Sequence, residues 1–551
     1  MLIGFDASRA FVDEATGTEN YSLNLLKALA KIDRKNRYRV YLRSGSQFTL
    51  RLRSGQTVHS SERKKKSINR GPVTDNFKWP PNFEFKLIRP RRFWTQIGLA
   101  WETWKNPVDL LFIPAHTLPI FRRRKPFKGT TSSQGTTGIT GLKNGKARGT
   151  RDTLVTRDTR YVVTIHDLGV EYLLLYHQFP QRYYLDLASK YAANAADALI
   201  AVSEATRRDL IDRYKVGTKK VFVVPEGVDM RFFKPSSKLK VQSVKSKYKI
   251  KGPYILFVGT VQPRKNLECL IEAFSQLVHS SQNSSQLRVD PSTSLRAGSS
   301  QTKQNSAASV NSEQRIENQL SVNRELITDN LQLIILGKLG WDYQKILDAP
   351  KKYGVGNRVK FLGYVNRADL SSLYTGASVL AAPSLFEGFD LPILEALSCG
   401  CGVAASDIPA HREILNSLME YARGSVGSSS YGALAFGRFL TRDQMSLRST
   451  EGPWPLANGV IARSKASSPR TLSKLRNMNY QLPTSDSVRI AEAMILVKPD
   501  DIEEWVHVLY QYISIYEKRL TLVTKMRNLA SKFSWEEAAK STLAVFERVL
   551  G

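Results

Sequence analysis

Two glutamates, Glu387 and Glu395, lie in the stretch SLFEGFDLPILEAL, which follows the apolar run ASVLAAP. The apolar run is typical of a buried strand that ends near Ser384. Asp390 can cap a helix and Pro392 is tolerated in a first turn, so we expect a helix to begin between the two glutamates. Such carboxylates could hydrolyse a glycoside, bind a metal or accept hydroxyl hydrogen bonds, and taken alone they could also be an ordinary turn and helix surface.

A second polar cluster, GTVQPRKNL, follows the apolar run YILFV. Arg264 and Lys265 fall where a helix begins, and two cations beside free helix N–H groups make a strong site for an anion such as a diphosphate. A carboxylate does not hold a phosphate, but it accepts two hydrogen bonds from a vicinal diol. Because ligands of parallel α/β sheets bind at the carboxyl ends of strands, both clusters can face one cleft. A diphosphate flanked by two diols describes a nucleotide sugar.

The elements that must position these residues alternate between short apolar strands and amphipathic helices, which predicts parallel sheets covered on both faces. The expected strands are residues 1–7, 108–114, 160–167, 197–203, 221–227, 254–261, 331–337, 359–364, 378–384, 402–406 and 494–499. We therefore predict the α/β class, with two doubly wound, Rossmann-like domains facing a cleft, residues 1–230 and 231–533. A last helix, residues 534–551, begins at the capping box SWEE and is expected to pack back on the first domain.

The chain has 551 residues, more than one core usually organises, and a net charge of +32. Four aperiodic stretches interrupt the pattern, 43–79 and 121–160 in the first domain and 279–329 and 418–490 in the second, and they carry +22 of that charge. We interpret them as low-complexity surface loops, with a basic arm for phospholipid headgroups or nucleic acid as the alternative. Nucleic-acid binding is disfavoured, because these loops are poor in the aromatic residues that bases stack on.

The location and the membrane contacts of the chain are predicted from three features. Three cysteines, Cys269, Cys399 and Cys401, form neither a disulfide framework nor a CxxC pair, which favours a reducing, cytoplasmic location. No uninterrupted apolar run is long enough to predict a transmembrane helix, and the start MLIGFDASRA is typical of a strand rather than a signal peptide. The aromatic segment RFWTQIGLAWETW, with RPRR at its start, either rests on an anionic bilayer or packs in the core.

The motifs GTVQPRKNLECLIEAF and PSLFEGFDLPILEALSCGCGVAASDIPAHREI resemble the retaining glycosyltransferases of family 4, which have the GT-B fold, and Glu387 and Glu395 match the family's E-x7-E motif. The segments TGTENYSLNLLKAL, WTQIGLAWETW, FIPAHTLP, TIHDLGVE, AVSEATRRDL and VPEGVD resemble the family in the same order. The resemblance implies transfer of a hexose from a nucleotide sugar to a hydroxyl of a glycan or polyprenyl-linked acceptor, with retention. The pattern is most similar to bacterial mannosyl- and rhamnosyltransferase-like members of cell-envelope polysaccharide synthesis, so GDP-mannose is the first expected donor, ahead of UDP- and dTDP-sugars.

The resemblance also implies roles for individual residues. Arg264 and Lys265 would hold the donor diphosphate and stabilise its charge as it leaves, Glu387 would contact the sugar hydroxyls, and Glu395 would bind the ribose. His166, at the end of the strand YVVTIHD, would reach the sugar near the reacting carbon. The other donor-binding positions are Gly17 in the N-terminal loop, Gly259 and Thr260 before the PRKN turn, Tyr364 and Val365 beside the nucleobase, and Gly388, Phe389 and Leu391.

The sequence departs from the family in two positions of the site. Asp390 replaces the second glycine of the common EGFGLP motif, which we expect to be compatible with helix capping, and Thr260 stands where some relatives have a further arginine. No DxD motif at a strand end and no His/Cys cluster is present, so we expect neither a cofactor nor an essential metal. The alternatives are a glycosidase, which would need no diphosphate site, a relative inactivated by its insertions, and a basic nucleic-acid-binding relative.

Overall fold

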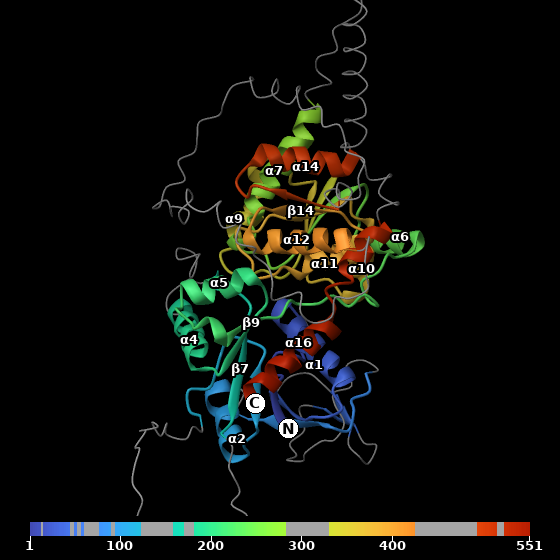
Figure 1. The fold of residues 1–551 in the computed structure, drawn as a ribbon. Helices are drawn as coiled ribbons and strands as arrows, with labels where there is room; N and C mark the ends of the chain where they lie inside the picture. The colour runs from blue at the N-terminus through green and yellow to red at the C-terminus, as the bar shows by residue number, and fades with distance from the viewer. Residues whose placement is uncertain are drawn as a thin grey trace, which may run out of the picture.

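The computed structural model of the chain describes residues 1–12, 15–43, 49–51, 57–59, 77–89, 94–122, 158–169, 181–282, 330–424, 493–514 and 523–551. They form two α/β domains, one above the other in Figure 1. Most of the four predicted insertions, and with them the interpretation as surface loops, lies outside the described residues. Two helices run a short way into the stretches predicted to be irregular, because α7 (Leu267–Gln282) and α12 (Pro409–Gly424) are longer than expected.

The N-terminal domain is built on a parallel seven-stranded sheet with the order β5-β2-β1-β6-β7-β8-β9. Its strands are β1 (Leu2–Asp6), β2 (Arg37–Arg43), β5 (Phe83–Ile88), β6 (Leu110–Ile113), β7 (Arg160–Ile165), β8 (Ala198–Ala201) and β9 (Val221–Val223). Its helices are α1 (Gly17–Ile32), the π-helix η1 (Trp94–Leu99), α2 (Ala100–Lys105), α4 (Gln181–Ala195), α5 (Glu204–Asp212) and the 3-10 turn η2 (Thr218–Lys220). A separate antiparallel pair joins β3 (Thr49–Arg51) to β4 (Thr57–His59).

Strands β2 and β5 were not among the predicted strands. Their sequences, RYRVYLR and FEFKLI, alternate charged and apolar residues instead of forming the continuous apolar run that the prediction required. The two strands pair with each other at one side of the sheet, where β5 is the edge strand. One face of an edge strand is less deeply covered, so charged side chains such as Lys86 are tolerated there.

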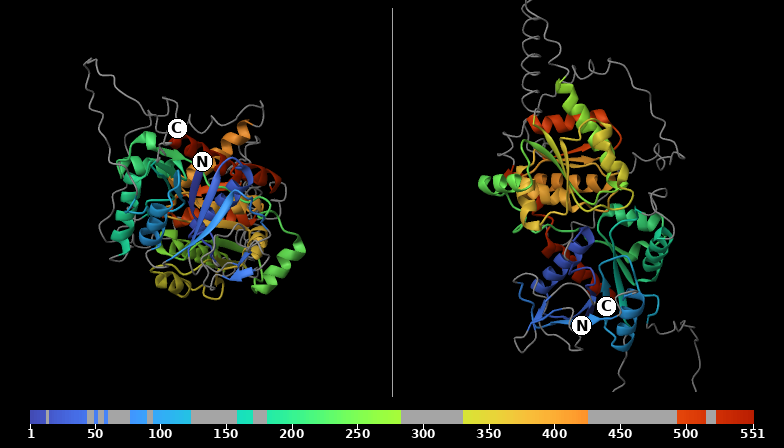
Figure 2. Two further views of the ribbon diagram at one scale, coloured as in Figure 1. Left: turned by 90° about the horizontal axis from the view of Figure 1, so that it is seen from below. Right: turned by 180° about the vertical axis from the view of Figure 1, so that it is seen from behind.

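The C-terminal domain has a parallel six-stranded sheet with the order β12-β11-β10-β13-β14-β15 and helices on both faces (Figure 2). The strands are β10 (Tyr254–Val258), β11 (Gln332–Leu336), β12 (Val359–Gly363), β13 (Val379–Ala382), β14 (Val403–Ser406) and β15 (Met494–Val497). Its remaining helices are α6 (Lys238–Lys247), the 3-10 turn η3 (Pro263–Lys265), α9 (Gln344–Lys352), α10 (Arg367–Gly376), α11 (Leu391–Ser398), α14 (Ile502–Ser514) and α15 (Val523–Ala530). Strands β11 and β13 are buried along their whole length, as a parallel sheet covered on both faces requires.

The last helix, α16 (Trp535–Leu550), returns to the N-terminal domain and packs on α1, β7 and β8. The ring of Phe546 lies 5.2 Å from that of Phe112, and the ring of Trp535 lies 5.7 Å from that of Tyr21. Ser534 caps the helix by accepting a hydrogen bond from the backbone N–H of Glu537 at 3.1 Å. The predicted two-domain α/β fold with a returning C-terminal helix is therefore confirmed. None of the helices within the described ranges is long and apolar enough to cross a membrane.

Candidate functional site

A cleft of about 370 Å³ lies between the two domains, where the carboxyl ends of strands from both sheets face each other. Its volume falls in the range of ligand pockets. The residues predicted to act in catalysis or donor binding all line it: Gly17, His166, Gly259, Thr260, Arg264, Lys265, Tyr364, Val365, Glu387, Gly388, Phe389, Leu391 and Glu395. The fold thus brings together residues from both halves of the sequence, while the role of each stays a prediction.

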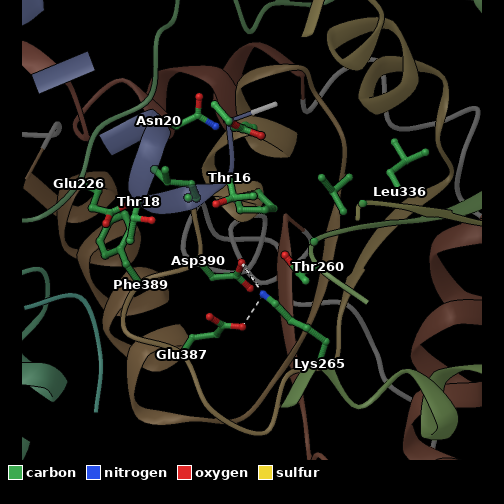
Figure 3. Close-up of a pocket in the computed structure, with 18 of the residues that line it drawn as sticks. Thr16, Thr18, Asn20, Glu226, Thr260, Lys265, Leu336, Glu387, Phe389 and Asp390 are labelled. Carbon is green, nitrogen blue, oxygen red and sulfur yellow. Dashed lines mark ion pairs between the residues drawn. The ribbon is translucent and has the colours of Figure 1, made fainter. Parts of the chain in front are cut away.

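A buried ion-pair cluster forms the floor of the cleft (Figure 3). The short turn η3 after β10 carries Arg264 and Lys265, and both cations converge on Glu387. Arg264 Nη1 lies 2.6 Å from Glu387 Oε2, and Lys265 Nζ lies 2.5 Å from Glu387 Oε1. Burial alone would raise the pKa of Glu387, but the charges of the two cations outweigh it and lower that pKa. The carboxylate is therefore ionised and pairs with both cations.

The glycine at position 259 leaves room for this arrangement. A Cβ added at Gly259 would lie 3.3 Å from Lys265 Cε and 3.5 Å from its Nζ. A larger side chain would therefore push Lys265 away from Glu387. Arg264 is held from a second side, because its Nη1 also donates to the carbonyl of Phe386 at 2.5 Å, and its own carbonyl accepts from the N–H of Leu385 at 2.9 Å.

Asp390 differs from its prediction. It occupies the N-cap position of α11, but its side chain makes no capping hydrogen bond, and its backbone is left-handed with φ of 85°. This conformation explains why glycine suits the position, since only glycine adopts it without strain. The Asp390 carboxylate instead lies 3.2 Å from Nε2 of the fully buried His411 and 3.7 Å from Lys265 Nζ. Nδ1 of His411 faces the carbonyl of Ser406 at 2.8 Å, so each ring nitrogen lies beside an oxygen atom.

Glu395 lies in the second turn of α11, as predicted, and accepts a hydrogen bond from the Tyr374 hydroxyl at 2.8 Å. Burial raises the pKa of Glu395 to about 7, against the opposing effects of the Arg367 charge and of this hydrogen bond. The two glutamates of the motif therefore differ in ionisation. Glu387 is a permanent carboxylate, whereas Glu395 changes charge near neutral pH.

His166 follows β7 and lies on the N-terminal wall of the cleft with both ring nitrogens engaged. Nδ1 lies 3.0 Å from Glu226 Oε1, and Nε2 lies 3.0 Å from the carbonyl of Pro114. Burial would lower the pKa of His166, but the hydrogen bond to Glu226, its charge and the Pro114 carbonyl together raise it. Since both partners are acceptors, they favour the protonated form of the ring and hold it in place. A side-chain contact with a sugar, as predicted, would require one of these bonds to be exchanged.

The N-terminus of α1 forms the wall opposite the ion-pair cluster, with Thr16, Thr18 and Asn20 facing the cleft (Figure 3). Thr16 is the N-cap, and Glu19 completes a capping box with it. Gly17 begins the helix, and no atom lies within 4 Å of where its Cβ would be. The first N–H groups of this 16-residue helix are thus accessible to an anion bound against Arg264 and Lys265.

The two domains touch beside the cleft. A Cβ added at Gly388 would lie 1.7 Å from the carbonyl oxygen of His166, so the domains can approach this closely only with glycine there. On α12, the carboxylate of Glu413 accepts hydrogen bonds from the N–H groups of Glu204 and Ala205 at 2.8 and 3.2 Å. These are the first residues of α5 in the other domain, and Ser203 caps that helix.

Several residues that line the cleft were not predicted from the sequence. Glu226 stands in the VPEGVD segment, but nothing local showed that it pairs with a histidine 60 residues away. Lys338 follows β11 and lies 5.6 Å from the centre of the Tyr364 ring, so the strand-end rule could have found it. Arg367 begins α10 and stacks at 4.6 Å on Phe232. Across the described ranges, no group of three or more His, Cys, Asp or Glu residues is arranged to hold a metal ion.

Two protein-family models match the chain. Glycosyltransferase Family 4 matches residues 146–232, and Glycosyl transferases group 1 matches residues 299–424. The first match contains His166 and Glu226, and the second contains the E-x7-E motif with Asp390 and His411. The matches thus fall one in each domain and meet at the cleft.

Curated relatives match about two fifths of the chain or slightly more. The O-antigen chain mannosyltransferase B of Escherichia coli is 24% identical over 257 residues, which are 46% of this chain and 55% of that protein. The D-inositol 3-phosphate glycosyltransferase of Kineococcus radiotolerans is 28% identical over 226 residues, 40% of this chain and 42% of that protein. The matched region therefore spans less than two thirds of either relative.

Solved structures match over the whole fold. Sucrose-phosphate synthase from Thermosynechococcus elongatus has a TM-score of 0.53 at 15% identity, covering 100% of this chain and 99% of that one. WaaG, a glycosyltransferase involved in lipopolysaccharide biosynthesis, has a TM-score of 0.51 at 13% identity, with 99% of each chain covered. Anabaena HepE in complex with UDP-glucose has a TM-score of 0.50 at 14% identity, with 100% of each covered. The chain therefore has the fold of these glycosyltransferase structures, with one domain that matches glycosyltransferase family 4 and one that matches glycosyl transferases group 1.

Proposed function

We propose that the protein is a retaining hexosyltransferase that uses a nucleotide sugar and needs no metal ion. The observation that carries the proposal is the convergence of Arg264 and Lys265 on the buried Glu387, directly opposite the N-terminus of α1. Buried cations are costly unless they serve a partner. Two cations and a helix N-terminus around one cleft match the charge and size of a diphosphate.

Donor binding would exchange the partners in this cluster. A diphosphate would take hydrogen bonds from Arg264, Lys265 and the first N–H groups of α1. Glu387 would then turn its oxygens to the sugar hydroxyls, which a carboxylate accepts in pairs. Glu395 would accept the ribose hydroxyls. Tyr364 and Lys338 would flank the nucleobase, since both line the same cleft and Lys338 Nζ lies 5.6 Å from the centre of the Tyr364 ring.

The transfer step needs no group on the protein to act as nucleophile. The bond between the anomeric carbon and the diphosphate oxygen breaks, and its electron pair goes to the leaving diphosphate, which Arg264 and Lys265 stabilise. The acceptor oxygen then bonds to the same face of the anomeric carbon. Its proton passes to the leaving phosphate oxygen, which lies on that face. The contact of Gly388 with His166 would exclude water from this step.

GDP-mannose is our first candidate donor, because the sequence pattern is most similar to mannosyltransferases and one matched relative bears that name. A UDP-sugar is the second, because a structural neighbour was solved with UDP-glucose. We propose a glycan or polyprenyl-linked acceptor of cell-envelope polysaccharide synthesis. Such an acceptor would be met in the cytoplasm, at the inner face of the plasma membrane.

A donor panel tests the proposal. GDP-mannose, UDP-glucose and dTDP-rhamnose are each offered with a polyprenyl-linked acceptor, with and without EDTA, and the anomeric configuration of the product is read by NMR. Lys265→Ala should lower the rate about 100- to 1,000-fold, as expected for loss of a preorganised charge. The exposed Lys238→Ala serves as the control and should leave the rate unchanged.

Three results would contradict specific parts of the proposal. Near-normal turnover of Lys265→Ala would reject the role of the cation cluster. Activity lost in EDTA and restored by Mn²⁺ would reject metal independence. Binding of a donor with neither transfer nor hydrolysis, across the panel, would favour an inactive relative.

A further inference from the structure

The surface of η1 and α2 exposes large apolar side chains on one side of the helix. Trp94 and Leu99 are buried in the core. Ile97, Trp101 and Trp104 are 53%, 69% and 53% exposed. Their spacing of four and three residues places these three on one face. The sequence left open whether the aromatic residues of this segment pack in the core or meet a bilayer, and the structure divides them between the two sides of the helix.

A second segment extends this surface. Ile120 and Phe121 are 58% and 75% exposed. The side chain of Gln96 fixes the segment beside η1, because its Nε2 donates to the carbonyl of Leu118 at 3.1 Å and its Oε1 accepts from the N–H of Ile120 at 2.8 Å. We call Ile97, Trp101, Trp104, Ile120 and Phe121 the apolar patch. It holds five of the twelve large hydrophobic side chains that are exposed within the described residues, so it is not a random scatter.

The charges around the apolar patch are positive. Arg89 and Lys105 are exposed at the two ends of the helical segment, and the Arg122 guanidinium lies over the rings of Tyr161 and Tyr191, next to Phe121 in sequence. The acid on this helix, Glu102, is neutralised, because Lys86 Nζ lies 2.5 Å from its Oε1. In the sequence, the cations PRR at 90–92 and RRK at 123–125 adjoin the two segments, although they lie outside the described residues.

We propose that the apolar patch docks on an anionic lipid bilayer, with the tryptophans inserted at the level of the headgroups. Tryptophan suits this depth, because its ring is apolar and its N–H needs a polar partner. The surrounding cations match the negative surface of the cytoplasmic leaflet, and this match favours lipid over a neutral protein partner. Figure 1 shows α2 at the foot of the N-terminal domain, away from the second domain, so that docking leaves the other domain free to move.

The inference rests on the proposed function, because a polyprenyl-linked acceptor would lie in such a bilayer. Its test measures membrane binding and does not depend on sugar transfer. Full-length protein is mixed with vesicles of phosphatidylcholine alone or with 30% phosphatidylglycerol, and binding is measured by flotation at low and physiological salt. Bound tryptophan is detected by quenching with lipids brominated near the headgroup.

The matched variants are Trp101→Ser with Trp104→Ser, and Leu239→Ser as the control, because Leu239 is 84% exposed on α6 in the other domain. We expect binding to phosphatidylglycerol vesicles that weakens with salt, a loss of at least tenfold in the double variant, and no change in the control. The melting temperature and its rise with nucleotide should stay the same in all three, which shows that the variants fold and that the cleft is intact.

Three outcomes would overturn the inference. The native protein would fail to float with anionic vesicles. The double variant would bind them as well as the native protein, which would assign binding to the basic loops. The native protein would form a concentration-dependent dimer that the double variant lacks, which would make a second copy the occupant of the apolar patch.

Discussion

The ionisation of Glu395 gives a prediction that links burial to donor binding. Its pKa is raised to about 7, and we assign it to the ribose hydroxyls, which the carboxylate accepts but the neutral acid accepts poorly. Donor binding must then select the ionised form. With one such group, the dissociation constant should be near its plateau at pH 8, about twofold weaker at pH 7 and about tenfold weaker at pH 6.

The assay is titration calorimetry with the intact nucleotide sugar between pH 6 and 8. A nucleotide sugar is used because its diphosphate is esterified at both ends and has no ionisation in this range. Repeating the titration at pH 7 in buffers of different ionisation enthalpy counts the protons released, and we expect about half a proton per donor bound. Glu395→Gln should bind more weakly at pH 8 and lose the pH dependence.

The variant also separates Glu395 from His166, whose pKa is raised as well and which could titrate in the same range. Glu395→Gln retains His166, so only the part of the slope that disappears belongs to Glu395. A dissociation constant that is flat from pH 6 to 8 in the native protein would refute the reasoning. So would a slope that persists unchanged in Glu395→Gln.

Three further substitutions test the geometry of the cleft. Gly388→Ala should lower the rate of transfer about 100-fold, because its methyl group would collide with the carbonyl of His166 and push the domains apart. Gly217→Ala, which has no atom within 4 Å of the added methyl group, should leave the rate unchanged in the same assay. Glu226→Gln removes the anion that raises the pKa of His166, so the alkaline limb of the pH–rate profile should move to lower pH. An unmoved limb would mean that the charge of His166 does not affect the rate. Asp390→Gly relieves the left-handed strain but removes the partner of Nε2 of the buried His411. The free energy of unfolding should therefore fall by about 2 kcal/mol in urea titrations, and a rise would show that strain dominates.

The fold class, and the cleft at which the predicted site residues meet, follow from the sequence. Continuous apolar strands between amphipathic helices require parallel sheets, and ligands of such sheets meet the carboxyl ends of strands, which is where the PRKN turn and the E-x7-E motif stand. The cap at Ser534 and the return of the last helix also followed from local residues. The edge strand β5 and its neighbour β2 were not predicted, because their alternating sequences lack the continuous apolar run.

Only the tertiary structure decided how the polar residues pair. Arg264 and Glu387 are far apart in the sequence, so nothing local showed that the cations pair with Glu387, that Glu226 holds His166, or that Asp390 faces a buried histidine instead of capping its helix. The burial of the tryptophans in η1 and α2 could not be predicted either, because it depends on which other elements of the domain pack against them. The periodicity of a sequence shows which face of a helix or strand is apolar. It does not show which residue pairs with a charged side chain or which element packs on an apolar face, because those partners are distant in the chain.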